Sequence, residues 1–310
     1  LEIPLRIGGR EVCTGRIGRV ICPHDHGHVL AEYHQAGENE YRQAIGAALA
    51  AREPWARLPW SDRASIFLRA AELVVGKYRG VLNAATMLNQ SKNPHEAEID
   101  AVAELADFLR FNVWFMQRIY ANQPRAHAPG SWNRSCYRPL EGFVFAVSPF
   151  NFTSIAGNLA AAPALMGNVV VWKPASASVL SNSYLMEVYR EAGLPDGVIN
   201  FVPGPGPLAG RMALQSAHLA GVHYTGSTAV FSSLWKSIGG RIRSYRNYPR
   251  LVGETGGKNF VFVHPSADLD AAAEALARGA FEYQGQKCSA VSRVYVAKSC
   301  WPELWRRLEP

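Results

Sequence analysis

One short segment of the sequence carries a side chain that can form a covalent bond with a substrate. Cys288 follows Lys287 directly, within the segment from Gly285 to Ser289, just after an apolar helical pattern. A thiol attacks a carbonyl carbon as its thiolate, and a neighbouring cation favours that form. A single cysteine is more often a small buried hydrophobic residue, so other segments must decide between a nucleophile and a core residue.

Four further segments combine polar residues with glycine or proline, close to expected strand ends. They are Ser148-Pro149-Phe150-Asn151-Phe152, Trp172-Lys173-Pro174, Tyr224-Thr225-Gly226-Ser227 and Gly253-Glu254-Thr255-Gly256-Gly257-Lys258. Each one alone has an ordinary explanation, as a turn, a strand end, a helix cap or a solvated glycine turn. Their joint occurrence in this order is hard to obtain by chance and indicates one composite site.

Strands and helices alternate in the part of the chain that must position these segments. Strands are expected over 142–147, 168–172, 198–202, 221–224 and 259–263, and helices over 181–192, 207–215, 230–239 and 268–283. This alternation predicts parallel strands with crossover helices, which is an α/β sheet. Ligands of such sheets bind at the carboxyl ends of the strands.

The N-terminal part is expected to be extended over 1–20 and then mainly helical. Helices are predicted over 39–52, 64–78 and 96–120, followed by a Pro/Gly-rich connector over 122–133. Ser61 or Asp62 is expected to cap the second helix. The acidic residues at the start of the third helix, including Asp100 and Glu104, are favoured there by the helix dipole.

Composition argues against several classes of function. The formal net charge is +7, but the basic residues are scattered without a block of like charges, so no nucleic-acid partner is expected. No apolar run reaches about 18 residues, so no membrane span is expected. His24, His26 and His28 lie in a Pro/Gly-rich turn without a distant ligand cluster, so we expect a solvated turn and no metal.

The cysteines and the chain ends give two further expectations. The five cysteines are far apart and form no CxxC pair, which favours reduced thiols in an intracellular compartment. The chain starts at Leu1 without a visible signal peptide, and it stops within an amphipathic pattern over 301–310. We therefore expect a part of a longer polypeptide or a truncated form.

The five segments, in this order, resemble the signature motifs of the aldehyde dehydrogenase superfamily. The sequence matches its PxNF, WKP, TGS, ExGGK and GQxC motifs, and Glu254 and Cys288 are 34 residues apart, similar to the family's separation. The resemblance runs from about residue 10 to the end. It implies an α/β fold with a Rossmann-type NAD-binding domain and an N-terminal helical segment over 1–252. The incomplete beginning of an α/β catalytic domain would follow over 253–310.

Finer features resemble the Δ1-pyrroline-5-carboxylate dehydrogenase branch, the glutamate-γ-semialdehyde dehydrogenases. The resemblance lies in the stretches 97–112 (AEIDAVAELADFLRFN), 148–158, 162–168 and 281–290, and in the lysine before the nucleophile. It implies NAD-dependent oxidation of the small aldehyde L-glutamate γ-semialdehyde to L-glutamate in proline catabolism. It also implies a homo-oligomer for a full-length chain, in the mitochondrial matrix of a eukaryote or the cytoplasm of a bacterium.

The resemblance assigns catalytic roles to three residues. Cys288 would attack the aldehyde carbon as a thiolate. The Asn151 side-chain amide and the Cys288 backbone N–H would stabilise the resulting oxyanion. After hydride transfer to the nicotinamide, Glu254 would activate the water that hydrolyses the thioester, as a general base.

The cofactor residues follow from the same resemblance. Lys173 would contact the adenosine ribose, and Gly226 and Ser227, at a helix N-terminus, would face the pyrophosphate. The resemblance also places Ser148, Pro149, Phe150 and Glu254 in the cofactor site. Ser176 stands where many family members carry an acid that binds the ribose 2′-hydroxyl, so NADP has room, although the branch favours NAD.

Four residues are candidates for the substrate site. Lys287, helped by the Ser289 hydroxyl, would bind the substrate carboxylate. Glu104 would serve the charged end of the substrate, or else be a helix-dipole or surface charge. Phe152 would pack against the aliphatic part of the substrate or belong to the core.

Two alternative functions remain open. The same motifs suit a dehydrogenase for another small acidic or aliphatic aldehyde. A truncated, catalytically inactive subunit with a structural role in a larger assembly belongs to a different class, and the intact Cys288, Glu254 and Asn151 argue mildly against it.

Overall fold

The computed structural model describes residues 1–309. They divide into two compact units, Leu1–Glu254 and the residues from Thr255 onward. The division lies two residues beyond the boundary expected between 252 and 253. That the first unit binds NAD and the second begins a catalytic domain stays a prediction.

A seven-stranded sheet forms the centre of the first unit, with the strand order β10-β9-β6-β7-β8-β2-β3. The parallel strands are β6 (Phe143–Val147), β7 (Val169–Lys173), β8 (Ile199–Phe201), β9 (Leu219–Thr225) and β10 (Arg250–Glu254). β2 (Leu5–Ile7) pairs antiparallel with β8 and with β3 (Arg10–Val12). The predicted parallel α/β sheet is confirmed, and β6 to β9 are largely buried, as strands covered on both faces are.

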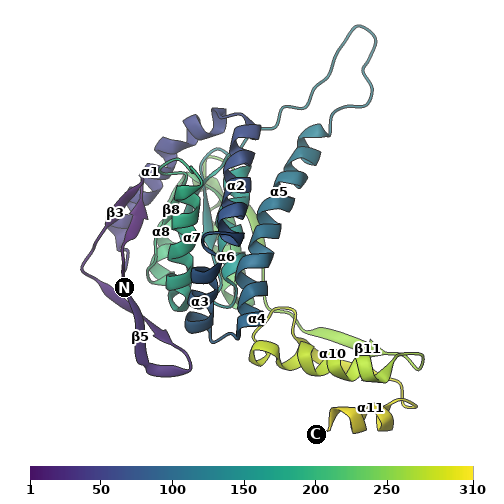
Figure 1. Ribbon diagram of the computed structural model, residues 1–310. Helices are drawn as coiled ribbons and strands as arrows, with labels where there is room; N and C mark the ends of the chain where they lie inside the picture. Colours follow the sequence, from purple (N-terminus) through teal and green to yellow (C-terminus); the bar gives the residue numbers. More distant parts are fainter. Residues whose placement is uncertain (310) are drawn as a thin grey trace. The chain divides into compact units, whose positions relative to one another are not determined.

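Four crossover helices connect these strands (Figure 1). They are α6 (Thr153–Leu165), α7 (Val179–Glu191), α8 (Gly206–Gln215) and α9 (Thr228–Gly240). The chain runs outward from β6 through β7 to β8 and returns to the other side of β6 as β9, so the winding reverses between β6 and β9. The crossover α6 is missing from the sequence prediction, because it is buried nearly all round and so shows no apolar stripe.

The first N-terminal helix packs on this sheet, whereas the second and third pack on the crossover helices. These three helices are α1 (Glu38–Arg57), α2 (Trp60–Val75) and the unpredicted α3 (Arg79–Gln90). The first ends five residues later than predicted, and the second starts four residues earlier and ends three residues earlier. The predicted cap of the second helix is wrong, since Pro59 is the N-cap residue and Ser61 and Asp62 lie inside the first turn. The reason is that Pro59 has an extended ψ of 142°, and the helical backbone starts directly after it.

The helix predicted over 96–120 is present but contains a π-helical segment. α4 (Pro94–Ala97) leads into η1 (Glu98–Ala103), and α5 (Glu104–Ala121) follows without a break. Asn93 caps the start, because its side chain accepts the Glu96 N–H at 2.9 Å and Glu96 accepts the Asn93 N–H at 3.0 Å. π-helical turns occur often at functional sites, and η1 lies directly before the predicted substrate residue Glu104.

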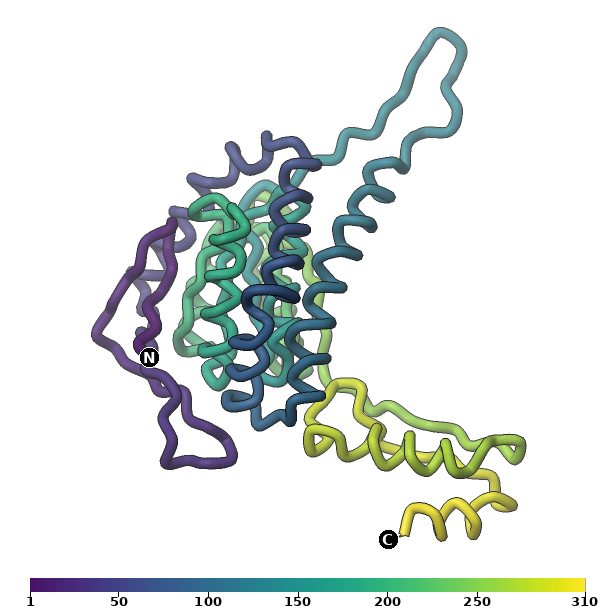
Figure 2. The backbone as a smooth tube through the Cα atoms, in the orientation of Figure 1, coloured from purple at the N-terminus to yellow at the C-terminus, as the bar shows by residue number. Residues whose placement is uncertain are grey.

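The connector after α5 has no regular secondary structure as far as Leu140, as predicted for 122–133. It protrudes from the helices as a long loop (teal in Figure 2). A separate three-stranded sheet at the N-terminus has the order β1-β5-β4, from β1 (Glu2–Ile3), β4 (Ile17–Cys22) and β5 (Asp25–His34).

The second unit is small. β11 (Asn259–Val263) pairs in parallel with β12 (Val291–Val296), and α10 (Leu269–Phe281) and α11 (Trp301–Leu308) pack with them. Its buried core consists of Val263, Ala273, Leu276 and Leu304. α10 ends two residues earlier than predicted, because its C-cap residue Glu282 has an extended ψ of 132°. Tyr283 and Gln284, in the 3-10 segment η4 (Glu282–Gly285), then adopt positive φ angles of 51° and 53°.

The helices differ in length, and α1 has 20 residues. Among the helices of residues 1–309, none combines the length and the apolar character that a bilayer crossing needs.

Candidate active site

The carboxyl edge of the seven-stranded sheet collects most of the predicted site residues of the first unit. The relevant positions are Ser148–Phe152 after β6, Lys173 at the end of β7, Gly226 and Ser227 after β9, and Glu254 at the end of β10. The register aligns Val147 with both Lys173 and Tyr224, and Glu254 with Thr225. These positions therefore share one edge, on both sides of the point where the winding reverses, which is where α/β sheets bind ligands.

Ser148 joins the ends of two strands at this edge. Its hydroxyl accepts the indole N–H of Trp172 at 3.0 Å, and its backbone N–H donates to the Lys173 carbonyl at 3.2 Å. Ser148 and Pro149 are buried, whereas the Phe150 side chain is 42% exposed. Ser148 thus holds the edge in shape, and Phe150 is the member of this segment that a ligand can reach.

Lys173 is the cationic side chain that ends β7 at this edge. Burial lowers the pKa of Lys173 from its usual range. An ammonium that has lost part of its hydration gains from a ligand that offers oxygen acceptors, and ribose hydroxyls are such a ligand. Ser176 is exposed at the start of the 3-10 segment η2 (Ser176–Ser178).

Gly226 and Ser227 form an exposed helix start. The Ser227 hydroxyl caps α9 by accepting the Val230 N–H at 3.4 Å, and the Gly226 N–H donates to the Glu254 carbonyl at 3.1 Å. A Cβ on Gly226 would lie 2.5 Å from the Tyr224 hydroxyl, which donates to the Ser227 carbonyl at 3.1 Å. The N-terminus of α9 favours a phosphate through its N–H groups and dipole, so the residues at this edge fit a dinucleotide.

Asn151 lies between β6 and α6, and a buried cation holds its backbone. The Lys92 ammonium, fully buried, donates to the Asn151 carbonyl and forms an ion pair with Asp100 at 2.7 Å. It also lies 4.4 Å from the centre of the Phe152 ring. Lys92 stands in a polar stretch and was not predicted as a site residue, and Asp100 was predicted only as a helix-dipole residue.

Glu104 contacts the first turn of α6. It accepts a hydrogen bond from the Ser154 hydroxyl at 2.5 Å and is half-buried. This environment differs from that of an open surface charge. Phe152 is 8% exposed, so the ring is packed in the structure. The substrate roles of Glu104 and Phe152 stay predictions.

In the second unit, Cys288 lies in the turn between η4 and β12 and is half-buried. The Asn259 side-chain amide donates to the Cys288 carbonyl at 2.6 Å. A Cβ on Gly257 would lie 2.9 Å from the same carbonyl. A side chain at position 257 would therefore clash with the backbone of the nucleophile, which explains the glycine there. The backbone of the nucleophile is therefore held by the motif that follows Glu254.

Lys287 has an acidic neighbour that the sequence analysis missed. Its ammonium lies 3.5 Å from the Glu282 carboxylate, and its side chain is 12% exposed. Glu282 starts η4, five residues before Lys287. Ser289 is exposed. The cation beside the nucleophile is thus oriented by the turn that carries it. Of the predicted catalytic residues, Asn151 and the exposed Glu254 belong to the first unit and Cys288 to the second.

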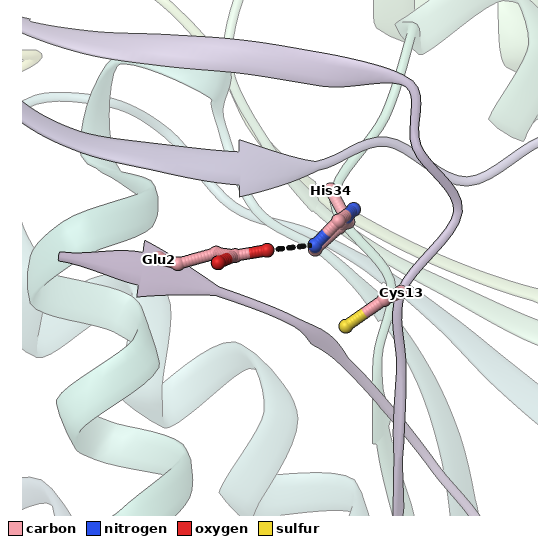
Figure 3. Close-up of side chains that lie close together, drawn as sticks. All are labelled: Glu2, Cys13 and His34. Atoms are coloured by element: carbon pink, nitrogen blue, oxygen red, sulfur yellow. Dashed lines mark hydrogen bonds and ion pairs between the residues drawn. The ribbon is translucent and has the colours of Figure 1, made fainter.

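Three side chains of the first unit could together offer metal ligands. Within residues 1–309, Glu2, Cys13 and His34 bring ligand atoms within 4.8 Å of one another (Figure 3). However, His34 Nδ1 accepts the N–H groups of Thr14 and Gly15 at 3.1 and 3.3 Å, so Nε2 carries the proton and donates to Glu2 at 2.7 Å. A metal would need that nitrogen's lone pair, so these bonds favour a structural role for His34.

Known proteins resemble this chain over nearly its whole length. Δ1-pyrroline-5-carboxylate dehydrogenase of Agaricus bisporus is 54% identical over 300 residues, which cover 97% of this chain and 55% of the relative. The mitochondrial Δ1-pyrroline-5-carboxylate dehydrogenase of Bos taurus is 49% identical over 306 residues, 99% of this chain and 54% of the relative. The chain thus spans about half the length of these curated relatives.

A solved structure and a family profile complete the comparison. The Δ-pyrroline-5-carboxylate dehydrogenase of Mycobacterium tuberculosis bound with NAD is 52% identical, with a TM-score of 0.95 over 99% of this chain and 57% of that one. The profile of the aldehyde dehydrogenase family matches residues 13–310. With this match over almost all of its residues, the chain belongs to the aldehyde dehydrogenase family, as its five motifs predicted.

Proposed function

We propose that the protein containing this chain catalyses the NAD-dependent oxidation of L-glutamate γ-semialdehyde to L-glutamate, in proline catabolism. The observation that carries the proposal is Cys288 in a turn that also orients Lys287, within a chain of the aldehyde dehydrogenase family. The relatives from Agaricus bisporus and Bos taurus, both named Δ1-pyrroline-5-carboxylate dehydrogenase, support the choice of substrate.

The reaction uses Cys288 as its nucleophile. The thiolate adds to the aldehyde carbon, and the carbonyl oxygen becomes an oxyanion that accepts hydrogen bonds from the Asn151 amide and the Cys288 N–H. The Lys287 ammonium, next in the chain, favours the thiolate over the thiol. The Asn259 bond to the Cys288 carbonyl keeps the backbone of the nucleophile in place.

The second half of the reaction releases glutamate. The chemistry that NAD supplies when bound is hydride acceptance, which leaves a thioester on Cys288. Glu254 then takes a proton from water, the water oxygen attacks the thioester carbon, and the C–S bond breaks to return the Cys288 thiolate. Glu254 is exposed and ends β10, so water reaches it.

The carboxyl edge supplies the dinucleotide residues. Lys173 contacts the adenosine ribose, and Gly226 and Ser227 at the start of α9 face the pyrophosphate. Ser148, Pro149, Phe150 and Glu254 complete this set. The hydroxyl at Ser176 carries no charge that would repel a 2′-phosphate, so NADP is not rejected. We favour NAD, which is bound in the similar structure from Mycobacterium tuberculosis.

The substrate has a carboxylate and an ammonium group, and the proposed site has groups of both signs. Lys287 and the Ser289 hydroxyl bind the carboxylate, with Glu282 limiting where the Lys287 ammonium can lie. Glu104 binds the ammonium, and Phe152 packs against the methylene groups. A preference for a neutral aldehyde would remove Lys287 from this role.

Production of NADH from glutamate semialdehyde by the protein isolated from its source tests the proposal. We expect Cys288→Ala to lower kcat by on the order of 10⁴ or more, since the covalent route disappears. Cys136→Ala is the matched control, because Cys136 is exposed in the connector and should leave kcat unchanged. An active Cys288→Ala variant would contradict the mechanism.

The same assay separates the remaining alternatives. Faster oxidation of acetaldehyde or succinate semialdehyde would favour a dehydrogenase for another small aldehyde. No activity together with no NAD binding would favour a structural subunit, and an intact mass near 34 kDa would agree with a truncated form.

Assembly and location belong to the proposal as well. We place a eukaryotic protein in the mitochondrial matrix, as the name of the Bos taurus relative suggests, and a bacterial one in the cytoplasm. Self-association is supported by exposed apolar side chains on α5, namely Phe111, Trp114, Phe115 and Ile119. Light scattering of the purified protein tests for a homo-oligomer.

A further inference from the structure

We infer that the buried ion pair of Lys92 and Asp100 is a positioning device for the oxyanion donor Asn151. The inference rests on the proposed function, in which the Asn151 amide stabilises the oxyanion. Lys92 and Asp100 contact no reacting atom in the proposed mechanism, and they act through the backbone of Asn151.

The Lys92 ammonium is surrounded by fixed partners. It is 0% exposed, and the carboxylate of Asp100, 2% exposed, lies 2.7 Å away. A second bond runs from the ammonium to the Asn151 carbonyl, and the Phe152 ring lies 4.4 Å from the nitrogen. Lys92 therefore contacts two consecutive residues of the segment that carries the donor, with a hydrogen bond to one and a cation–π contact to the other.

Stability alone does not explain a buried pair of this kind. Removing two charges from water costs several kcal/mol per ion, and a well-packed apolar pair often serves equally well. An apolar pair, however, cannot donate a hydrogen bond to the Asn151 carbonyl. The feature that requires a charged or polar side chain at Lys92 is thus its contact with the donor segment.

The residues that follow Phe152 are held by further hydrogen bonds. Thr153, which starts α6, shares hydrogen bonds of 2.9 Å with Thr86 and Gln90 of α3. Ser154 donates to Glu104. Since α6 fixes the backbone after Phe152, the bond from Lys92 fixes the peptide plane between Asn151 and Phe152, and hence the direction of the Asn151 side chain.

The π-helical turn supplies the other half of the pair. Asp100 lies inside η1 and is buried. Such turns occur often at functional sites, and here the turn brings a carboxylate to a buried cation. An oxyanion donor contributes on the order of 10²–10³ in rate when it is placed in advance, and a displacement of about 1 Å costs on the order of 10².

Two matched double variants isolate the hydrogen bond from the charges. Lys92→Met/Asp100→Asn removes both charges and the donor at nearly constant volume. Lys92→Gln/Asp100→Asn also removes both charges but keeps an N–H donor at position 92. Both are made in the protein expressed from its complete coding sequence, and each is also combined with Asn151→Ala.

The kinetic pattern decides between positioning and general support of the fold. We expect the Met variant to lower kcat for glutamate semialdehyde by about 10-fold to 100-fold, and the Gln variant to recover most of it. The KM for NAD should stay within about twofold, because Lys173 and Ser227 are unchanged. Combined with Asn151→Ala, the Met variant should add little further loss, since both changes remove the same interaction.

Three outcomes would overturn the inference. They are an unchanged kcat in the Met variant, equal kcat losses in the Met and Gln variants, and a loss that adds fully to that of Asn151→Ala. If the Met variant does not fold, the Gln variant decides alone: a kcat near the wild-type value supports the inference, and a loss of about 10-fold or more that adds fully to that of Asn151→Ala overturns it. Failure of the proposed function gives a different result, because Asn151→Ala would then leave kcat unchanged or the wild-type protein would be inactive.

Discussion

The two units of the chain prepare their functional residues in different ways. In the first unit, a large continuous core supports the carboxyl edge, and Ser148, Lys173 and Asn151 are each held by buried or partly buried neighbours. In the second unit, four buried residues form the core, and the nucleophile lies in an irregular turn.

The two units hold their functional residues in place by different kinds of contact. The proposed cofactor residues Ser148 and Lys173 stand at or next to the ends of the buried strands β6 and β7, so the sheet fixes them, whereas Asn151 is held by the bond from Lys92 to its carbonyl. The nucleophile depends instead on a few specific contacts, namely the bond from Asn259 to the Cys288 carbonyl, the glycine at Gly257 and the pair of Lys287 and Glu282. The second unit should therefore open at a lower free energy than the first.

The largest expected effect on the free energy of opening comes from truncating one core leucine in each unit. Leu304→Ala removes a fully buried side chain from a core of four residues, and Leu82→Ala removes one from the large core. Each should cost about 2–5 kcal/mol in the free energy of opening of its own unit. Amide hydrogen exchange measures this, with β11 and β12 reporting on the second unit and β6 and β7 on the first.

The expected pattern is selective. Leu304→Ala should raise exchange in β11 and β12 by a factor of about 30 or more, and leave β6 and β7 protected. Leu82→Ala should loosen the first unit. If Leu304→Ala opened β6 and β7 equally, the two units would behave as one cooperative block and the comparison would fail.

The sequence predicted the regular parts of the first unit well, for a physical reason. Strands buried on both faces read as apolar runs, and the helices that cover them mostly show one apolar face. α6 was not predicted, because it is buried nearly all round and shows no single apolar face. The cap of α2 was predicted at the wrong residue, because Pro59 starts the helix earlier. Such features depend on tertiary packing, which no local pattern carries.

The residues of the candidate site were likewise predicted from the sequence only in part. The motifs identified Cys288, Glu254, Asn151 and Lys173, since each stands in a short and specific segment. Lys92 and Asp100 carried no such signal, because a lysine in a polar stretch and an aspartate near a helix start are ordinary on a surface. Their burial arises from η1 and from the packing of α3 against neighbouring elements. Positioning residues are thus the part of a site that sequence patterns miss most easily.

Lowering the pH is expected to have a smaller effect on stability, and this effect concerns the first unit. Burial lowers the pKa values of His218 and His223 from their usual range, and His223 Nδ1 lies 3.0 Å from the Leu159 carbonyl. Below about pH 6.5 the unfolded histidines bind protons while the folded ones stay neutral, so the unfolded state binds more protons and stability falls with falling pH. His223, which is the more buried of the two, contributes at most about 1.4 kcal/mol per pH unit, and His218 contributes less because solvent screens it.

The measurement is exchange in β9 between pH 7 and pH 5, with His223→Gln as the matched variant. Glutamine can still donate to the Leu159 carbonyl but does not titrate, so the pH slope of the variant should be smaller. An equal slope in both proteins would assign the acid sensitivity to other groups.

The smallest effect concerns the backbone of the turn before the nucleophile. Gln284 is exposed and has a φ of 53°, a region that costs a non-glycine residue about 1–2 kcal/mol. Gln284→Gly removes this cost, adds about 0.5–1 kcal/mol of chain entropy, and loses the 3.3 Å bond from Gln286. We expect a net stabilisation of the second unit below about 1 kcal/mol. Gln284→Ala keeps the unfavourable φ and should destabilise slightly. If both variants destabilised equally, side-chain contacts rather than backbone conformation would limit the stability of this turn. The turn would then depend on side-chain packing, as the strand-end residues of the first unit do.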